Sequence, residues 1–274
     1  MKRKICIDAG HYGVYNPSPV ERSYVEAQVM WKLHLMLKEQ LEKQGFDVVV
    51  TRKNQAIDLP LEERGRMALG CVGFVSLHSN AADSPEPNWA VAMHFIEDSR
   101  TDLDEQSKAL GDLLAKTVGD TMGVGYEIFS RVSSQDRDGD GRQDDYYGVL
   151  RGARSVGVPG VILEHGFHTN PGNARWLLED GNLRKLAERE AEVLALFFGA
   201  FKMIGMELPV LKKGAKGDPV RAMQMLLLGN GYTLDLDGSF GVKTENALMS
   251  YQEDKSLTPD GSCGRKTWTA LLGL

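Results

Sequence analysis

The sequence predicts an α/β domain with a mostly parallel twisted sheet and helices on both faces, followed by a small all-α domain. Apolar, strand-like runs alternate with helical segments as far as residue 203. The alternation of strand-like and helical segments ends at a proline-containing linker, and beyond the linker a glycine-rich turn occurs twice. We therefore expect a larger domain at 1–203, a linker at 204–209 and a smaller domain at 210–274.

Five short apolar runs in the larger domain predict strands. Each is bounded by polar or turn-forming residues, and helical segments separate most of them. Strands in such an order form a mostly parallel sheet that helices cover on both faces. The predicted strands span residues 4–8, 46–51, 73–77, 90–96 and 160–164.

The first predicted helix of the larger domain spans residues 24–44. Apolar residues recur along it at helical spacing, and Gly45 follows as a C-terminal cap. The next helix, at 60–70, begins with Pro60 and ends at Gly70. Further helices are predicted at 104–118, 170–180 and 182–203.

The C-terminal segment contains an internal near-repeat. "DGSFGVKTENAL" (237–248) and "DGSCGRKTWTAL" (260–271) are identical at eight of twelve positions. Each copy predicts a glycine-rich turn followed by the start of a helix, and a further helix is predicted at 219–228. Cys263 occupies the position of Phe240, so we expect it to be a buried apolar side chain.

Composition excludes several classes of function. The net charge of -6, without a dense basic stretch, argues against nucleic-acid binding. No apolar run approaches the ~20 residues that a membrane span requires, so we expect no stable membrane association. The apolar run in the N-terminal "MKRKICID" is too short for the core of a signal peptide. This predicts synthesis in the cytoplasm. The three cysteines are widely spaced and are expected to stay reduced.

Polar residues at the ends of predicted strands indicate a metal site. His11 and His78 each come just after an apolar run, and the carboxyl ends of parallel strands gather reacting groups. A catalytic zinc site uses three protein ligands and leaves one position open. We expect Glu26, in the first turn of the first helix, to be the third ligand, with Glu21 as the alternative.

Glu164 ends a third apolar run and is the candidate catalytic residue. An acidic residue at the end of an apolar strand is costly unless it is paired or lies at a site. Such a carboxylate can accept the proton of an attacking water and return it to a leaving amine. The nearby His165 and His168 either influence Glu164, bind substrate or have no functional role.

Four motifs together resemble the zinc-dependent N-acetylmuramoyl-L-alanine amidases of cell-wall lysis. They are "IDAGH", "VEAQVMWKLHLMLKEQLEKQGFDVVVTR", "FVSLHSNA" and "GVILEHGFHTNPGNARWLL", and they cover about residues 4–200 in the order of that family. The resemblance implies that His11, Glu26 and His78 bind zinc and that Glu164 is the catalytic acid/base. It further implies hydrolysis of the amide between N-acetylmuramic acid and the L-alanine of the stem peptide.

The C-terminal segment resembles the small helical peptidoglycan-binding domain with two D-G-x-[FV]-G-x-x-T motifs. The resemblance covers nearly all of 209–274 and implies that bacterial peptidoglycan is the partner. Such a domain raises the effective concentration of an enzyme at an insoluble polymer.

One acidic loop has the spacing of a calcium site. Asp136, Asp138, Asp140 and Asp144 occupy positions 1, 3, 5 and 9 of a calcium-binding loop. Position 12, where a glutamate is expected, is Tyr147. A solvated acidic turn is the alternative interpretation.

The sequence thus predicts a two-domain peptidoglycan hydrolase that uses a zinc-activated water. A phage or prophage endolysin, acting on the wall after release from the cell, is the favoured interpretation, and a bacterial autolysin is the alternative. A zinc peptidase that cuts within the stem peptide would use the same ligands. A catalytically dead wall-binding protein is the alternative outside the enzymes.

Overall fold

The computed structural model divides the chain into two compact units, Met1–Val193 and Leu194–Leu274, which are described separately. The predicted boundary after residue 203, and residues 204–207 of the predicted linker, lie outside the residues that the structure describes. The described residues are 3–96, 101–137, 141, 143–198 and 208–273.

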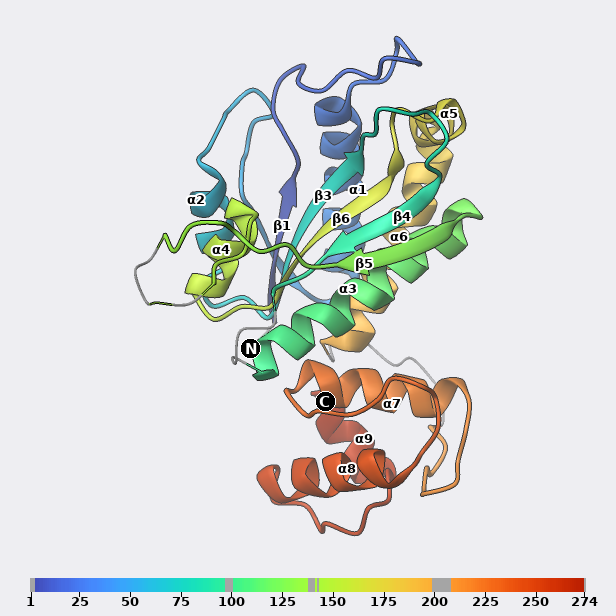
Figure 1. The fold of residues 1–274 in the computed structure, drawn as a ribbon. Helices are drawn as coiled ribbons and strands as arrows, with labels where there is room; N and C mark the ends of the chain where they lie inside the picture. Colours follow the sequence, from blue (N-terminus) through green and yellow to red (C-terminus); the bar gives the residue numbers. More distant parts are fainter. Residues whose placement is uncertain (1–2, 97–100, 138–140, 142, 199–207, 274) are drawn as a thin grey trace. The chain divides into compact units, whose positions relative to one another are not determined.

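The larger unit is built on a six-stranded sheet in the order β2-β1-β3-β6-β4-β5 (Figure 1). The first four strands in this order, β2, β1, β3 and β6, run parallel to one another. β4 is antiparallel to β6, and β5 is parallel to β4. The predicted mostly parallel sheet is therefore confirmed, and β5 is an additional strand. The strands are β1 (Lys4–Ala9), β2 (Asp47–Val50), β3 (Phe74–Asn80), β4 (Trp89–Met93), β5 (Gly125–Phe129) and β6 (Gly160–Phe167).

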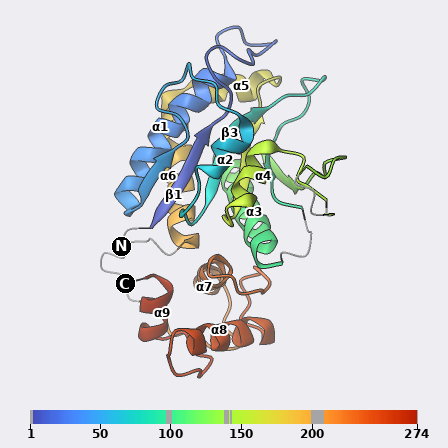
Figure 2. The ribbon, with the colours of Figure 1, turned by 90° about the vertical axis from the view of Figure 1, so that its left-hand side faces the viewer.

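Helices cover both faces of the sheet, as the sequence predicts. Figure 2 shows α2 and α4 on one side of the sheet and α1 and α6 on the other. On the α1 and α6 side, α3 packs its Gly111 against Ala92 and Val161. The helices are α1 (Glu26–Gln44), α2 (Leu61–Arg66), α3 (Thr101–Met122), α4 (Gly148–Ser155), α5 (Pro171–Leu178) and α6 (Asp180–Phe197).

Helix α1 illustrates how the sequence fixes an element and its end. Leu33, Leu37 and Leu41 repeat at helical spacing and are fully buried. Gly45 then adopts a left-handed φ of 101°, which glycine tolerates without a Cβ clash. In this conformation the Gly45 N–H donates to the carbonyl of Glu42, which closes the helix before β2.

The strand register places several polar residues on one face of the sheet. Ser76 pairs with Ile162 and His78 pairs with Glu164 across β3 and β6. Successive side chains of a strand point to opposite faces, so Ser76, His78 and Glu164 share a face. This is the face that α2 and α4 cover, because Ile162 belongs to the same core cluster as Leu150 of α4.

The smaller unit contains α7 (Asp218–Gly229), α8 (Val242–Asp254) and α9 (Arg265–Leu271). A backbone bridge pairs Leu211 with Cys263. Phe240 and Cys263, which occupy the same position of the two repeats, are both buried, as expected.

Each repeat of the smaller unit is organised around a buried glutamine. The Gln224 amide contacts Asp237 Oδ1 at 2.9 Å and Thr244 Oγ1 at 3.1 Å, and it accepts a hydrogen bond from the Gly238 N–H at 2.8 Å. Gln252 makes the same contacts in the second copy, with Asp260, Thr267 and Gly261. The sequence repeat is therefore also a repeat of one hydrogen-bond network.

Candidate active site

Three of the side chains predicted as metal ligands come together at one edge of the sheet. Ligand atoms of His11, Glu26 and His78 all lie within 4.8 Å of one another. Glu26 Oε2 lies 3.3 Å from His11 Nε2, and Glu26 Oε1 lies 3.0 Å from His78 Nδ1. Among the described residues, this is the one group of three or more histidine, cysteine or acidic side chains arranged in this way.

The backbone around β1 allows the two imidazole rings to approach each other. Gly10 lies under the ring of His78, and a Cβ at Gly10 would come within 2.5 Å of that ring. Only glycine therefore fits there without displacing a ligand. His11 has a left-handed φ of 53°, a conformation that non-glycine residues rarely adopt and that is typical of functional sites.

Glu26 is a buried carboxylate between the two histidines. Its side chain is 1% exposed and accepts a hydrogen bond from the Ser79 N–H at 3.1 Å. Asn16 Nδ2 also donates to Glu26. Burial opposes ionisation, but hydrogen bonds from His11 and His78 outweigh it and lower the pKa of Glu26. A buried anion facing two imidazoles suits a divalent cation, and two histidines with one carboxylate are a zinc ligand set.

The alternative ligand, Glu21, has other partners. Glu21 Oε1 accepts a hydrogen bond from Ser23 Oγ at 2.7 Å, and Glu21 Oε2 lies 3.6 Å from Arg175 Nε. It does not belong to the group formed by His11, Glu26 and His78.

Glu164 lies within β6, beside His78 in the register of the sheet. Its side chain is 7% exposed, and its Oε2 has no hydrogen-bond partner among the described residues. Burial, together with the negative charge of Glu26, raises the pKa of Glu164 well above its ordinary value. A carboxyl with a raised pKa can both accept and donate a proton near neutral pH.

His165 and His168 are both buried and hydrogen-bonded. His165 Nδ1 lies 2.9 Å from the carbonyl oxygen of His78, and its Nε2 lies 3.0 Å from Glu190 Oε1 in α6. His168 Nδ1 lies 2.9 Å from the carbonyl oxygen of Ser79. Neither histidine lines the cavity described next. His165 contacts the site through the backbone of β3, whereas His168 Nδ1 also lies 3.0 Å from Ser79 Oγ and 3.8 Å from Glu26 Oε2.

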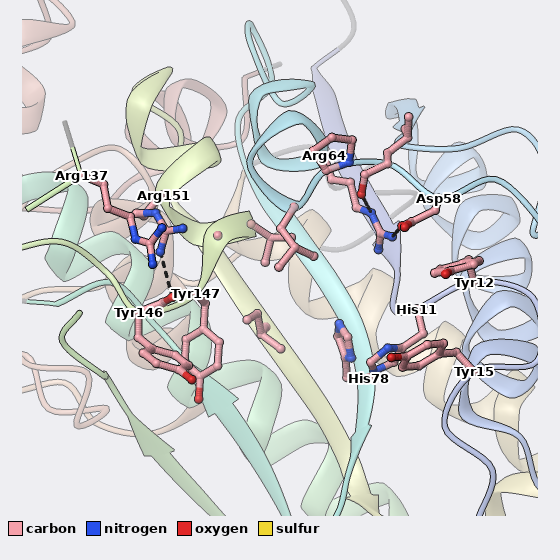
Figure 3. Close-up of a pocket in the computed structure, with 16 residues that line it drawn as sticks. His11, Tyr12, Tyr15, Asp58, Arg64, His78, Arg137, Tyr146, Tyr147 and Arg151 are labelled. Carbon is pink, nitrogen blue, oxygen red and sulfur yellow. Dashed lines mark hydrogen bonds and ion pairs between the residues drawn. The ribbon is translucent and has the colours of Figure 1, made fainter. Parts of the chain in front are cut away.

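A cavity of about 720 Å³ opens beside the two histidines. In Figure 3, His11, His78 and Tyr15 lie on one side of it, and Arg137, Tyr146, Tyr147 and Arg151 lie on the other. The sequence patterns predicted neither α4 nor a functional role for these residues of the second wall. The apolar residues Val149, Leu150 and Ala153, at helical spacing, were the available signal.

The predicted calcium loop is only partly described. Asp138 and Asp140 lie outside the described residues. Asp136 Oδ2 accepts a hydrogen bond from the Gly141 N–H at 3.0 Å, and Asp144 Oδ2 accepts one from the Arg137 N–H at 2.6 Å. Calcium binding therefore stays a prediction.

Comparison with known families agrees with the fold of both units. The family model of N-acetylmuramoyl-L-alanine amidases matches residues 5–195. The family model of a peptidoglycan-binding domain matches residues 216–271. No helix in the described part of the chain has the length and apolar character needed to cross a membrane.

Individual relatives are similar over limited regions. N-acetylmuramoyl-L-alanine amidase CwlM of Mycobacterium tuberculosis is 48% identical over 59 residues, which are 21% of this chain and 14% of that protein. An uncharacterized protein of Kitasatospora aureofaciens is 38% identical over 65 residues, which are 23% of this chain and 55% of that protein. The matched region thus spans only part of the curated relatives.

Solved structures show the same fold over the larger unit. The catalytic domain of the amidase CwlV from Bacillus (Paenibacillus) polymyxa has a TM-score of 0.55 at 20% identity, covering 71% of this chain and 98% of that chain. The amidase Ami1 of Mycobacterium smegmatis has a TM-score of 0.56 at 18% identity, covering 70% and 95%.

Proposed function

Because the chain belongs to the N-acetylmuramoyl-L-alanine amidase family, we propose that it is a peptidoglycan hydrolase. The bond cleaved is the amide between the lactyl group of N-acetylmuramic acid and the L-alanine of the stem peptide. The observation that carries the proposal is the convergence of His11, Glu26 and His78 beside a buried carboxyl, Glu164.

His11, Glu26 and His78 would hold one zinc ion. When bound, zinc supplies Lewis acidity that lowers the pKa of a coordinated water to about 7. The chain contributes a fixed ligand geometry: the Ser79 N–H and Asn16 orient the carboxylate of Glu26, and the ring of His78 rests on Gly10.

Glu164 is the proposed general acid and base. Its carboxylate accepts a proton from the attacking water as the water oxygen bonds to the carbonyl carbon. The same carboxyl then donates this proton to the departing nitrogen of L-alanine, so the free amine leaves as the C–N bond breaks. The low exposure of Glu164 keeps bulk water from competing for the proton.

The smaller unit is proposed to bind the cell wall. Its match to the peptidoglycan-binding family supports this role. Tethering to the insoluble polymer raises the local concentration of scissile bonds without adding chemistry.

Product analysis tests the proposed reaction. Purified cell walls are digested with the full chain, and mass spectrometry identifies the soluble products. We expect free stem peptides with an N-terminal L-alanine and glycan strands with intact lactyl groups. Cleavage within the stem peptide would show a peptidase instead. No release by a zinc-loaded protein would identify a wall-binding protein without activity.

A further inference from the structure

Helix α4, together with Arg137, Tyr146 and Tyr147 before it in the chain, forms the wall of the cavity that faces the proposed zinc site. Arg137 and Arg151 lie on this wall, across from His11 and His78 (Figure 3). Two cationic side chains on one wall of a cleft create a positive potential towards a ligand in it.

The side chain of Arg151 is held in a single position by three hydrogen bonds. Its Nε donates to Glu62 Oε1 at 3.0 Å, and its Nη1 donates to the carbonyl oxygens of Asp145 and Tyr146 at 2.7 and 2.8 Å. The side chain is 14% exposed. A guanidinium fixed in this way loses little conformational entropy when it binds a ligand.

One nitrogen of Arg151 remains available. Its Nη2 has no hydrogen-bond partner among the described residues, and it lies 3.4 Å from where a Cβ of Gly148 would stand. Glycine at position 148 therefore leaves room beside this nitrogen. The partner carboxylate, Glu62, is shared with Arg66 at 2.8 Å, so it neutralises Arg151 only in part.

Arg64, which also lines the cavity, differs from Arg151. Its Nε donates to the carbonyl oxygen of Leu59 at 3.0 Å, and its Nη2 pairs with Asp58 at 3.1 Å. Its Nη1 lies 3.7 Å from Asp8. Two nearby carboxylates therefore neutralise most of the positive charge of Arg64, so its attraction for an anionic ligand is weak.

We propose that Arg151 binds a carboxylate of the stem peptide through Nη2 and selects substrates whose second residue is acidic. This inference rests on the proposed function, which places the scissile amide beside His11 and His78. N-acetylated glycan is uncharged, whereas the peptide on the other side of the scissile bond is acidic. The cationic wall therefore binds the peptide side of the substrate, and charge-assisted pairing of guanidinium with carboxylate provides the selectivity.

The test compares two soluble substrates, N-acetylmuramoyl-L-alanyl-D-glutamate and its diamide. We expect the zinc-loaded full chain to cleave both, with kcat/KM about 10- to 100-fold higher for the dicarboxylate, as for one charge-assisted hydrogen bond. Arg151→Gln should remove this preference by lowering kcat/KM for the dicarboxylate while leaving the diamide unchanged. Arg151→Lys should keep part of the preference.

Arg66→Gln is the matched control, because Arg66 pairs with the same Glu62 but does not line the cavity. It should leave the preference intact. Equal cleavage of both substrates by the unmodified protein overturns the inference, whether or not the variants fold. An equal loss on both substrates in Arg151→Gln also overturns it, because a purely structural role predicts that result. Cleavage of neither substrate would instead count against the proposed function.

Discussion

His78 and Glu164 are register partners on the adjacent parallel strands β3 and β6. Their side chains therefore emerge on the same face of the sheet, one from each strand. The spacing between a proposed zinc ligand and the proposed general base is thus set by backbone hydrogen bonds in the core. A slip of one residue in either strand would send one side chain to the opposite face.

The metal site can be tested with a matched pair of glutamate variants. Glu26→Gln removes the buried negative charge between His11 and His78 and should abolish stoichiometric zinc binding, measured by elemental analysis. Glu21→Gln should retain zinc, because its carboxylate bonds to Ser23 instead. The opposite pattern would make Glu21 the ligand.

Removal of zinc by a chelator should stop peptidoglycan cleavage, and added zinc should restore it. The folded structure should survive, because the larger unit has an extensive apolar core independent of the site. Circular dichroism checks the fold. Full activity of a metal-free protein would contradict the proposed chemistry.

Glu164→Gln tests the general base. The amide has the shape of the carboxyl but cannot accept the proton, so we expect a loss of about 10²- to 10⁴-fold in kcat. Zinc content should be unchanged, because Glu164 is not one of the three ligands. Turnover close to that of the unmodified protein would assign the proton transfer to another group.

Asp145 should make the stability of the larger unit depend on pH. Burial raises the pKa of Asp145 to about 6, although Arg154 opposes this shift. A carboxyl whose pKa is higher in the folded state than in the unfolded state stabilises the fold when it is protonated. This contribution is fully present below the unfolded pKa, near 4. That stabilisation is lost as the pH rises through 6. A shift of this size corresponds to about 3 kcal/mol.

The measurement compares the unmodified protein with Asp145→Asn in denaturant at several pH values. Trp31, Trp89 and Trp176 all report on the larger unit. The free energy of unfolding of the unmodified protein, relative to the variant, should fall between pH 4 and pH 7. A rise over this range would mean that attraction between Asp145 and Arg154, 2.7 Å apart, outweighs burial.

The repeated glutamines should stabilise the smaller unit. Gln224→Ala and Gln252→Ala each leave buried polar partners unsatisfied, which should cost about 2–4 kcal/mol of unfolding free energy. Lys243→Gln, on the surface, is the control and should cost little. Trp268 fluorescence reports unfolding of this unit. Unchanged stability in both glutamine variants would show that the two networks are dispensable.

The two units should be separable in function. A fragment of residues 1–203 should bind zinc and cleave soluble muropeptides at nearly the full rate, because His11, Glu26, His78 and Glu164 all precede residue 194. It should act more slowly on intact walls, where tethering is lost. The 207–274 fragment should sediment with purified walls and cleave nothing. If this fragment stays in the supernatant while the full chain sediments, the wall-binding role is wrong.

The sequence by itself determined the elements whose residues carry a local periodic signal. The apolar residues of helix α1 recur at helical spacing, and strands β1, β3 and β6 are short apolar runs, so each element can be recognised from its own residues. Since four of the strands are parallel, the carboxyl ends of β1, β3 and β6 meet at one edge. The placement of His11, His78 and Glu164 near one another could therefore be predicted before the structure.

Only the tertiary structure decided the elements that depend on distant partners. β5 is an edge strand whose residues are largely exposed, so it has no apolar run. Helix α4 packs on α2 through Gly152 and Gly65, where a Cβ would come within 2.2 Å of backbone atoms in the other helix. A glycine gives no local sequence signal for a helix, so these two residues predicted neither α2 nor α4. Their close approach exists only when both helices are in place. The wall that carries Arg151 therefore became visible only in the folded chain.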